Sequence, residues 1–119
     1  MSDVPPEPPP EPPSDAILVL VTAPTSDVAV GLARALVEEG LAACGNVVPG
    51  LRSIYRWEDQ VHDEAEVLLV LKSRAPLFEP LRERVVALHP YQCPEVLQLD
   101  VAAGHAPYLR WIAAHVRAP

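Results

Sequence analysis

The hydrophobic pattern of the chain begins at Ala16 and changes period after the first strand. Residues 16–21 read AILVLV without a polar interruption, which predicts a strand buried on both faces. Thr25 follows as a candidate N-cap, and Gly40 is of the type that ends a helix. Between these two, apolar residues recur at the spacing of one helix face: Ala29, Leu32, Ala33, Leu36 and Val37. The pattern therefore predicts a strand followed by a helix.

A long β-hairpin is predicted next. Two extended segments, at 41–48 and 51–57, are separated by a proline–glycine break, and a returning strand follows at 61–73. The far end of this hairpin, IYRW at 54–57, is too apolar to suit a fully solvated position. Because a long free strand edge is a template for pairing, we expect the hairpin to contact another subunit.

The last part of the chain predicts a helix, a strand and a short helix, which span 75–88, 96–101 and 105–115. Pro80 lies inside the first of these and is expected to delay the helix start or to kink it. The elements then run βαββαβ with an additional C-terminal helix, which is the ferredoxin-like order. The predicted fold class is α+β, a ferredoxin-like sandwich with a long β-hairpin.

Composition predicts the domain limits and excludes several partners. Residues 1–14 hold seven prolines and predict a disordered Pro-rich tail, while 15–119 form a single domain. The net charge of −7 and the lack of a basic stripe argue against nucleic acid and against anionic membranes. No apolar run approaches the roughly 20 residues of a membrane span. Two cysteines and no leader-like segment are typical of a cytoplasmic protein.

The chemically richest stretch is HPYQCPE at 89–95. His89, Tyr91, Cys93 and Glu95 occupy alternate positions, so in an extended loop their side chains would face one side. Imidazole and thiol are ligands that copper and zinc prefer. The alternative interpretation is that His89 only closes a helix, where the helix dipole stabilises it, and that the prolines shape the loop.

Cys44 lies in the predicted second strand and has two interpretations. It is either a buried structural thiol or a partner of Cys93 in space, and the sequence leaves open whether the two thiols are free. The sequence contains no nucleophile motif and no acid–base pair at a defined spacing. An enzymatic function is therefore not expected.

Seven segments of the chain form a specific combination, in order and with regular spacing over residues 16–116. They are TAP at 22–24, LVEEG at 36–40, LAACGNVVPG at 41–50, SIYRWE at 53–58, VLLVLKS at 67–73, HPYQCPE at 89–95 and YLRWI at 108–112. Together these segments resemble the CutA family, the divalent-cation-tolerance proteins. The pairing of SIYRWE with HPYxxPE is the most specific part of the resemblance.

The resemblance implies a ferredoxin-like subunit in a homotrimer held by the long hairpins, with PII-like clefts between subunits. It also implies binding of copper or another divalent cation and a role in metal tolerance. His89 matches a proposed copper ligand of the family, whereas Val21 and Leu88 stand where some members have a cysteine and a second histidine. Cys93 is considered as a substitute ligand, and Cys44 matches the usual cysteine of the family.

Three hypotheses follow from these observations. The first is a non-enzymatic homotrimer that binds copper or another divalent cation at His89, with Cys93 or Cys44. The second is a PII-like sensor that binds a small anionic molecule in the cleft between subunits. Its candidate residues match motif positions: Arg56, Trp57, Lys72, Tyr91 and Glu95. The third is a structural trimer that anchors partners, including through the Pro-rich tail.

Overall fold

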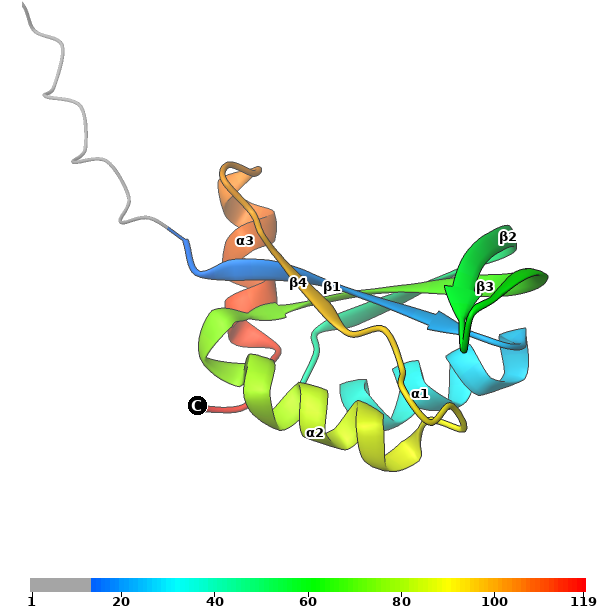
Figure 1. The fold of residues 1–119 in the computed structure, drawn as a ribbon. Helices are drawn as coiled ribbons and strands as arrows, with labels where there is room; N and C mark the ends of the chain where they lie inside the picture. Colours follow the sequence, from blue (N-terminus) through cyan, green and yellow to red (C-terminus); the bar gives the residue numbers. More distant parts are fainter. Residues whose placement is uncertain (1–13) are drawn as a thin grey trace, which may run out of the picture.

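The computed structural model describes residues 14–119, and within them the elements follow the predicted order (Figure 1). They are β1 (Ala16–Ala23), α1 (Ser26–Glu38), β2 (Cys44–Trp57), β3 (Gln60–Arg74), the 3-10 turn η1 (Ala75–Leu77), α2 (Phe78–Leu88), β4 (Leu97–Asp100) and α3 (Ala106–Ala114). The predicted disordered tail, except for its last residue, lies outside the described residues.

The four strands of the described region form one antiparallel sheet in the order β2-β3-β1-β4. Leu20 in β1 faces Val70 of β3 on one side and Leu97 of β4 on the other. This strand order, with a helix after β1 and another after β3, is that of the ferredoxin-like fold. The predicted α+β class and topology are therefore confirmed.

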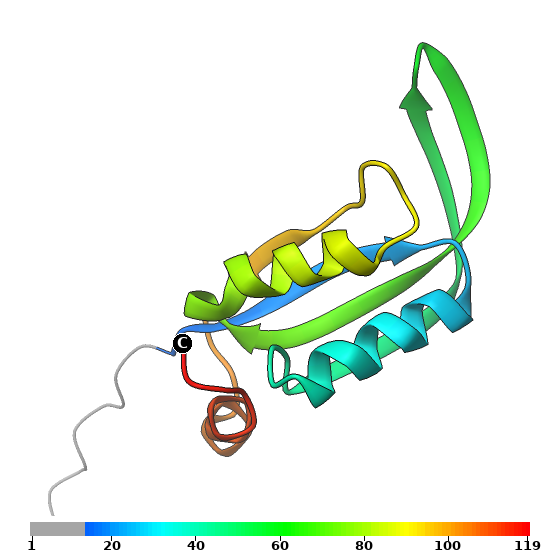
Figure 2. The ribbon, with the colours of Figure 1, turned by 90° about the horizontal axis from the view of Figure 1, so that it is seen from below.

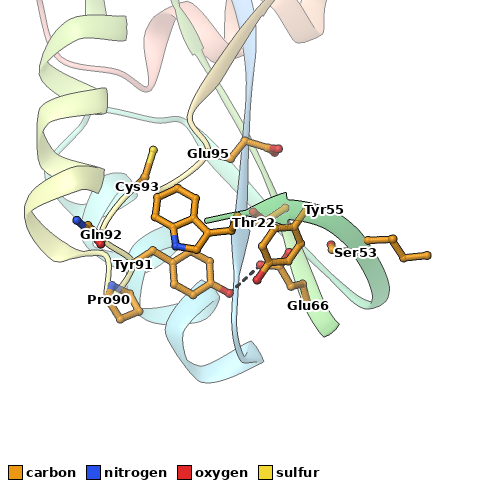
Figure 3. Close-up of a pocket in the computed structure, with 11 residues that line it drawn as sticks. Thr22, Ser53, Tyr55, Glu66, Pro90, Tyr91, Gln92, Cys93 and Glu95 are labelled. Atoms are coloured by element: carbon orange, nitrogen blue, oxygen red, sulfur yellow. Dashed lines mark hydrogen bonds between the residues drawn. The ribbon is translucent and has the colours of Figure 1, made fainter. Parts of the chain in front are cut away.

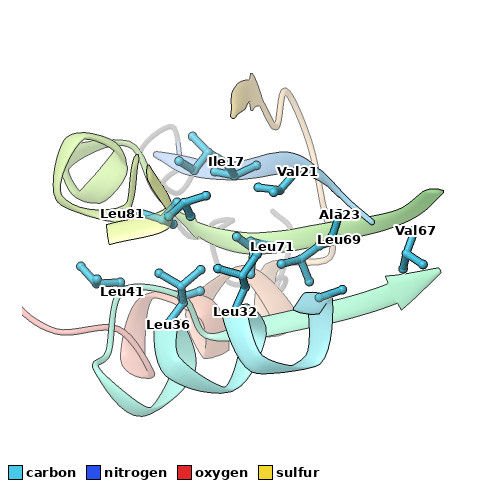
Figure 4. Close-up of a cluster of buried hydrophobic side chains, with 14 residues drawn as sticks. Ile17, Val21, Ala23, Leu32, Leu36, Leu41, Val67, Leu69, Leu71 and Leu81 are labelled. Carbon is cyan, nitrogen blue, oxygen red and sulfur yellow. The ribbon is translucent and has the colours of Figure 1, made fainter. Parts of the chain in front are cut away.

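Helices α1 and α2 cover one face of the sheet and form the main core with it (Figures 1 and 4). Figure 4 shows Leu69 and Leu71 of β3 directed toward Leu32 and Leu36 of α1. Full burial of a leucine side chain stabilises a fold by about 1.5–3 kcal/mol. Ser73 continues the same face of β3, and its buried hydroxyl donates a 2.7 Å hydrogen bond to the carbonyl of Leu41.

Strands β2 and β3 extend beyond the rest of the sheet as a two-stranded arm that curls away from the helices (Figures 1 and 2). The prediction of two separate segments for β2 was wrong, because a bulge between Val48 and Leu51 keeps the strand continuous. Gly50 at this bulge has a φ of +88°, a left-handed conformation that favours glycine. Ile54 and Val61 on the arm are exposed.

The sheet face opposite α1 and α2 is apolar and largely uncovered within one subunit. Helix α3 covers one end of it, where Ile112 packs against Ala16 and Ala43. The remaining large apolar side chains on this face are half-buried or exposed: Leu18, Leu20, Leu68, Val70, Leu97 and Leu99. Exposed apolar area of this kind is typical of an interaction surface.

Two predicted helix boundaries have clear physical causes. Helix α2 begins at Phe78, so Pro80 falls in the first turn, where its missing N–H would have no helical partner. The predicted late start of this helix is confirmed. Gly40 has a φ of +72° after the end of α1, as expected for a helix-ending glycine. No helix in residues 14–119 has the length and apolar character of a membrane span.

Candidate functional site

A pocket of about 640 Å³ opens between the base of the β2–β3 arm and the loop that follows α2 (Figure 3). Its lining combines aromatic rings, carboxylates and small polar groups: Thr22, Ser53, Ile54, Tyr55, Trp57, Glu66, Pro90, Tyr91, Gln92, Cys93 and Glu95. The residues come from three strands and the loop 89–95, so the pocket exists only in the folded chain. Its volume falls in the range of about 300–1,000 Å³ that is usual for small-molecule sites.

His89 fixes the loop through both of its ring nitrogens. Nε2 lies 2.8 Å from the carbonyl oxygen of Thr22, and Nδ1 accepts a 3.1 Å hydrogen bond from the backbone N–H of Tyr91. A carbonyl only accepts and an N–H only donates, so the proton sits on Nε2 and the ring is neutral. The buried ring also packs against the Tyr91 ring at 4.6 Å between centroids. In this arrangement neither nitrogen is available to a metal ion.

Two tyrosine–glutamate hydrogen bonds organise the carboxylates at the arm. The Tyr91 hydroxyl donates to Glu66 at 2.7 Å (Figure 3). The Tyr55 hydroxyl donates to Glu64 at 2.9 Å. Burial raises the pKa of Tyr91, and the hydrogen bond to Glu66 raises it further. The phenol therefore stays protonated and remains a donor to the buried Glu66 carboxylate.

The pocket is acidic. Glu66 and Glu95 both line it, and none of its lining residues is a lysine, arginine or histidine. Burial raises the pKa of Glu95, and the negative charge of Glu66 adds to the effect. Two like charges in one partly enclosed space favour a cation between them over an anion.

The predicted site residues separate into two groups in the structure. Trp57, Tyr91, Cys93 and Glu95 line the pocket, whereas Arg56 does not. Arg56 stands between two lining residues, Tyr55 and Trp57, but does not itself line the cavity. The predicted cleft set is therefore only partly brought together.

Lys72 and Cys44 lie elsewhere, opposite each other on β3 and β2 near α3. The Lys72 ammonium is 5.4 Å from the ring centre of Tyr108, and a hydrogen bond with Tyr108 is the main cause that raises the lysine pKa. The Cys44 thiol is 3.9 Å from the side-chain oxygen of Asn46. Both Cys44 and Cys93 are free thiols, so the possible pairing of the two is not present.

The donor chemistry of the pocket suits a divalent cation in part. Cys93 offers a thiol and Glu66 and Glu95 offer carboxylates, a mixed set typical of borderline ions. Within residues 14–119, however, no group of three or more histidine, cysteine or acidic side chains is arranged closely enough to hold a metal ion. The described residues of this chain therefore present an incomplete ligand set.

Comparison with known proteins identifies the family. The family model described as CutA1 divalent ion tolerance protein matches residues 17–115. The chain belongs to the CutA1 family. The resemblance drawn from the sequence motifs is thereby confirmed, and the family match covers every element that builds the pocket.

Relatives of the CutA1 family agree in sequence and in fold. A Thermus thermophilus divalent-cation tolerance protein CutA is 52% identical over 95 residues, which cover 80% of this chain and 92% of the relative. A chloroplastic CutA protein of Arabidopsis thaliana is 44% identical over 102 residues, covering 86% of this chain but 56% of the relative. This chain therefore spans little more than half of the plant relative's length.

Two solved structures carry the same fold. The Thermus thermophilus divalent cation tolerance protein has a TM-score of 0.83 at 48% identity, covering 86% of this chain and 99% of that structure. CutA1 from Oryza sativa has a TM-score of 0.86 at 40% identity, and the match covers 90% of this chain and 98% of that structure. The long β2–β3 arm and the α3 helix lie within the matched CutA1 region.

Sequence reasoning missed several lining residues of this CutA1-family pocket, among them Tyr55 and Glu66. The period of two along β2 was a usable signal, since Ser53, Tyr55 and Trp57 alternate and share one face of the strand. No comparable signal existed for Glu66, because its approach to Tyr91 depends on where the loop crosses the sheet.

Proposed function

We propose that the protein is a homotrimer that binds copper or another divalent cation and acts in divalent-cation tolerance. The observation that carries this proposal is the pocket, whose lining includes a thiol and two carboxylates and no basic side chain. Family membership adds to it, since the Thermus thermophilus relative is named for divalent-cation tolerance. Cys93 and Glu95 are the proposed ligands, with Glu66 as a further negative charge.

Cys93 gives the proposed site its preference among cations. A thiolate favours copper and zinc over calcium and magnesium, and Glu95 supplies a charged oxygen. Water or a neighbouring subunit would complete the coordination, because the part of the subunit that the structure describes places no third ligand there. His89 acts here as a positioning residue. Its role as a direct ligand stays a prediction, because a metal ion could bind the ring only after one of its two backbone contacts is broken.

The homotrimer is supported by surfaces that one subunit leaves uncovered. The open sheet face presents Leu97 and Leu99 on the edge strand β4, and the arm presents Ile54 and Val61. A second and third copy of the chain are the proposed occupants, as the family resemblance implies. Packing between copies would also bring the arm of one subunit close to groups of another, which is where missing ligands would come from.

Calorimetric titration tests the cation proposal. Under anaerobic conditions, zinc(II) and copper(II) are titrated separately into wild type and into Glu95→Gln. The glutamine keeps the side-chain shape and removes the charge, so affinity is expected to fall by about tenfold or more. Glu38→Gln, an exposed acid at the end of α1, serves as the matched control and is expected to bind like wild type. Equal, weak binding by all three proteins would refute the site.

The alternative function is a PII-like sensor of a small molecule, which the volume of the pocket favours. The anionic form of that hypothesis needs Arg56 and Lys72 in the cleft. Neither lines the pocket, and Lys72 is engaged instead with Tyr108 of α3. A sensor that uses this pocket would therefore be expected to bind a cationic or neutral molecule.

A further inference from the structure

We infer that the pocket also accepts a small organic ammonium ion, of the alkylated or quaternary amine class. This inference shares its pocket with the proposed function, and it does not require a bound metal ion. Its basis is the combination of an aromatic lining with carboxylates in a cavity far larger than a metal ion.

The aromatic part of the lining consists of Tyr55, Trp57 and Tyr91. Faces of tyrosine and tryptophan rings carry negative electrostatic potential and attract organic cations, with tryptophan the strongest. The hydroxyls of Tyr55 and Tyr91 each donate a hydrogen bond to a glutamate carboxylate, which makes both rings more electron-rich. Cages of such rings are a known means of binding alkylated ammonium groups.

The carboxylates supply charge where the rings supply contact area. Glu66 and Glu95 line the same cavity, so their negative charges repel each other. A cation placed between them relieves that repulsion, and an anion would increase it. The Glu66 carboxylate is held by the Tyr91 hydroxyl, so it is already oriented before a ligand arrives.

Size distinguishes an organic cation from a bare metal ion. Metal–oxygen and metal–nitrogen bonds are about 2.0–2.6 Å long, so a metal ion occupies only a small part of such a cavity. The pocket measures about 640 Å³, and within residues 14–119 no cluster of three metal-binding side chains closes around any point of it. An organic cation can contact the rings and the carboxylates at once.

The inference is tested by calorimetry with choline and its uncharged carbon isostere, 3,3-dimethylbutan-1-ol, on chelator-treated full-length protein. Choline is expected to bind about tenfold more tightly than the isostere, because only the charged ligand engages the carboxylates and ring faces. Equal affinities, or no heat from choline at millimolar concentration, would overturn the inference.

A matched pair of tryptophan variants localises the binding. Trp57→Leu removes a lining ring, while Trp111→Leu removes a ring on α3 outside the pocket; the two side chains are 42% and 39% exposed. Choline affinity should fall at least about fivefold in the first variant and stay unchanged in the second. The reverse pattern would contradict the assignment. The choline titrations contain no metal ion, so a failure of choline binding is distinguishable from a failure of zinc binding in the separate metal titrations.

Discussion

The hydroxyl of Tyr91 donates a 2.7 Å hydrogen bond to Oε2 of Glu66, which joins the loop after α2 to strand β3 across the candidate pocket. Tyr91→Phe removes the only donor in that contact and leaves a buried carboxylate without it. We expect the free energy of unfolding to fall by about 1–3 kcal/mol, the usual cost of an unsatisfied buried polar group. Urea unfolding at a fixed protein concentration measures the change.

Tyr55→Phe is the matched control for this substitution, because it breaks the equivalent bond to the exposed Glu64. Its expected cost is below about 1 kcal/mol, since water can replace the lost donor. Equal losses of stability in the two variants would show that the Tyr91 contact does not hold a buried charge.

His89 is expected to act by positioning the loop rather than by binding a ligand. His89→Ala removes the contacts to the Thr22 carbonyl and the Tyr91 amide, so we expect a loss of about 2 kcal/mol and faster hydrogen exchange at the Tyr91 amide. His115→Ala, at the exposed end of α3, is the control with little expected effect. Unchanged exchange at Tyr91 together with a large loss of zinc affinity would assign His89 as a ligand instead.

Assembly through the open sheet face predicts a difference between two equally exposed apolar residues. Leu99 lies on β4 and Val30 on α1, and each is 44% exposed in one subunit. Leu99→Asp should dissociate the trimer, because burying an unpaired charge at an interface is costly, whereas Val30→Asp should not. Light scattering is expected to give about three times 12.9 kDa for wild type and for Val30→Asp. A monomeric wild type would contradict the proposed assembly.

Asp15 predicts a defined pH dependence of stability. Its pKa is lowered from the ordinary value of 3.8, chiefly by the hydrogen bond from Arg74, whose guanidinium contacts it at 2.8 and 2.9 Å. A lowered carboxyl pKa contributes stability above its unfolded value, and this is lost as pH falls through the folded value. Because the pair is partly exposed, Asp15→Asn should cost only about 0.5–1 kcal/mol at pH 7.

The difference in free energy of unfolding between wild type and Asp15→Asn should therefore shrink below pH 3.8, as measured by urea unfolding. Asp63→Asn, which breaks the pair with the more exposed Arg52 on the arm, is expected to have a smaller effect at every pH. A constant difference for Asp15→Asn from pH 7 down to strongly acidic pH would refute the ionic origin of this contribution.

Local patterns were sufficient to predict most of the fold. The apolar period predicted α1, and the order of the elements predicted the sheet, because each element shows its period in its own residues. The continuity of β2 through its bulge was not predicted, since a proline–glycine pair is equally typical of a break. Gly50 adopts the left-handed conformation there without ending the strand.

The candidate site was predictable only where its residues lie close together in sequence. The loop residues Tyr91, Cys93 and Glu95 were identified from their alternation, and all three line the pocket. The contact of His89 with Thr22 joins residues 67 positions apart, and that of Tyr91 with Glu66 joins residues 25 apart. Such contacts depend on how the loop crosses the sheet, which no local period encodes.

The most direct test of the proposed cation site is the absorption spectrum of the protein with cobalt(II), a spectroscopic substitute for zinc. A thiolate bound to cobalt gives a charge-transfer band that other ligands do not give. The band is predicted in wild type and in Cys44→Ser, whose missing thiol lies outside the pocket, and it should be absent in Cys93→Ser. A band that survives in Cys93→Ser, or no band in wild type, would contradict Cys93 as a ligand.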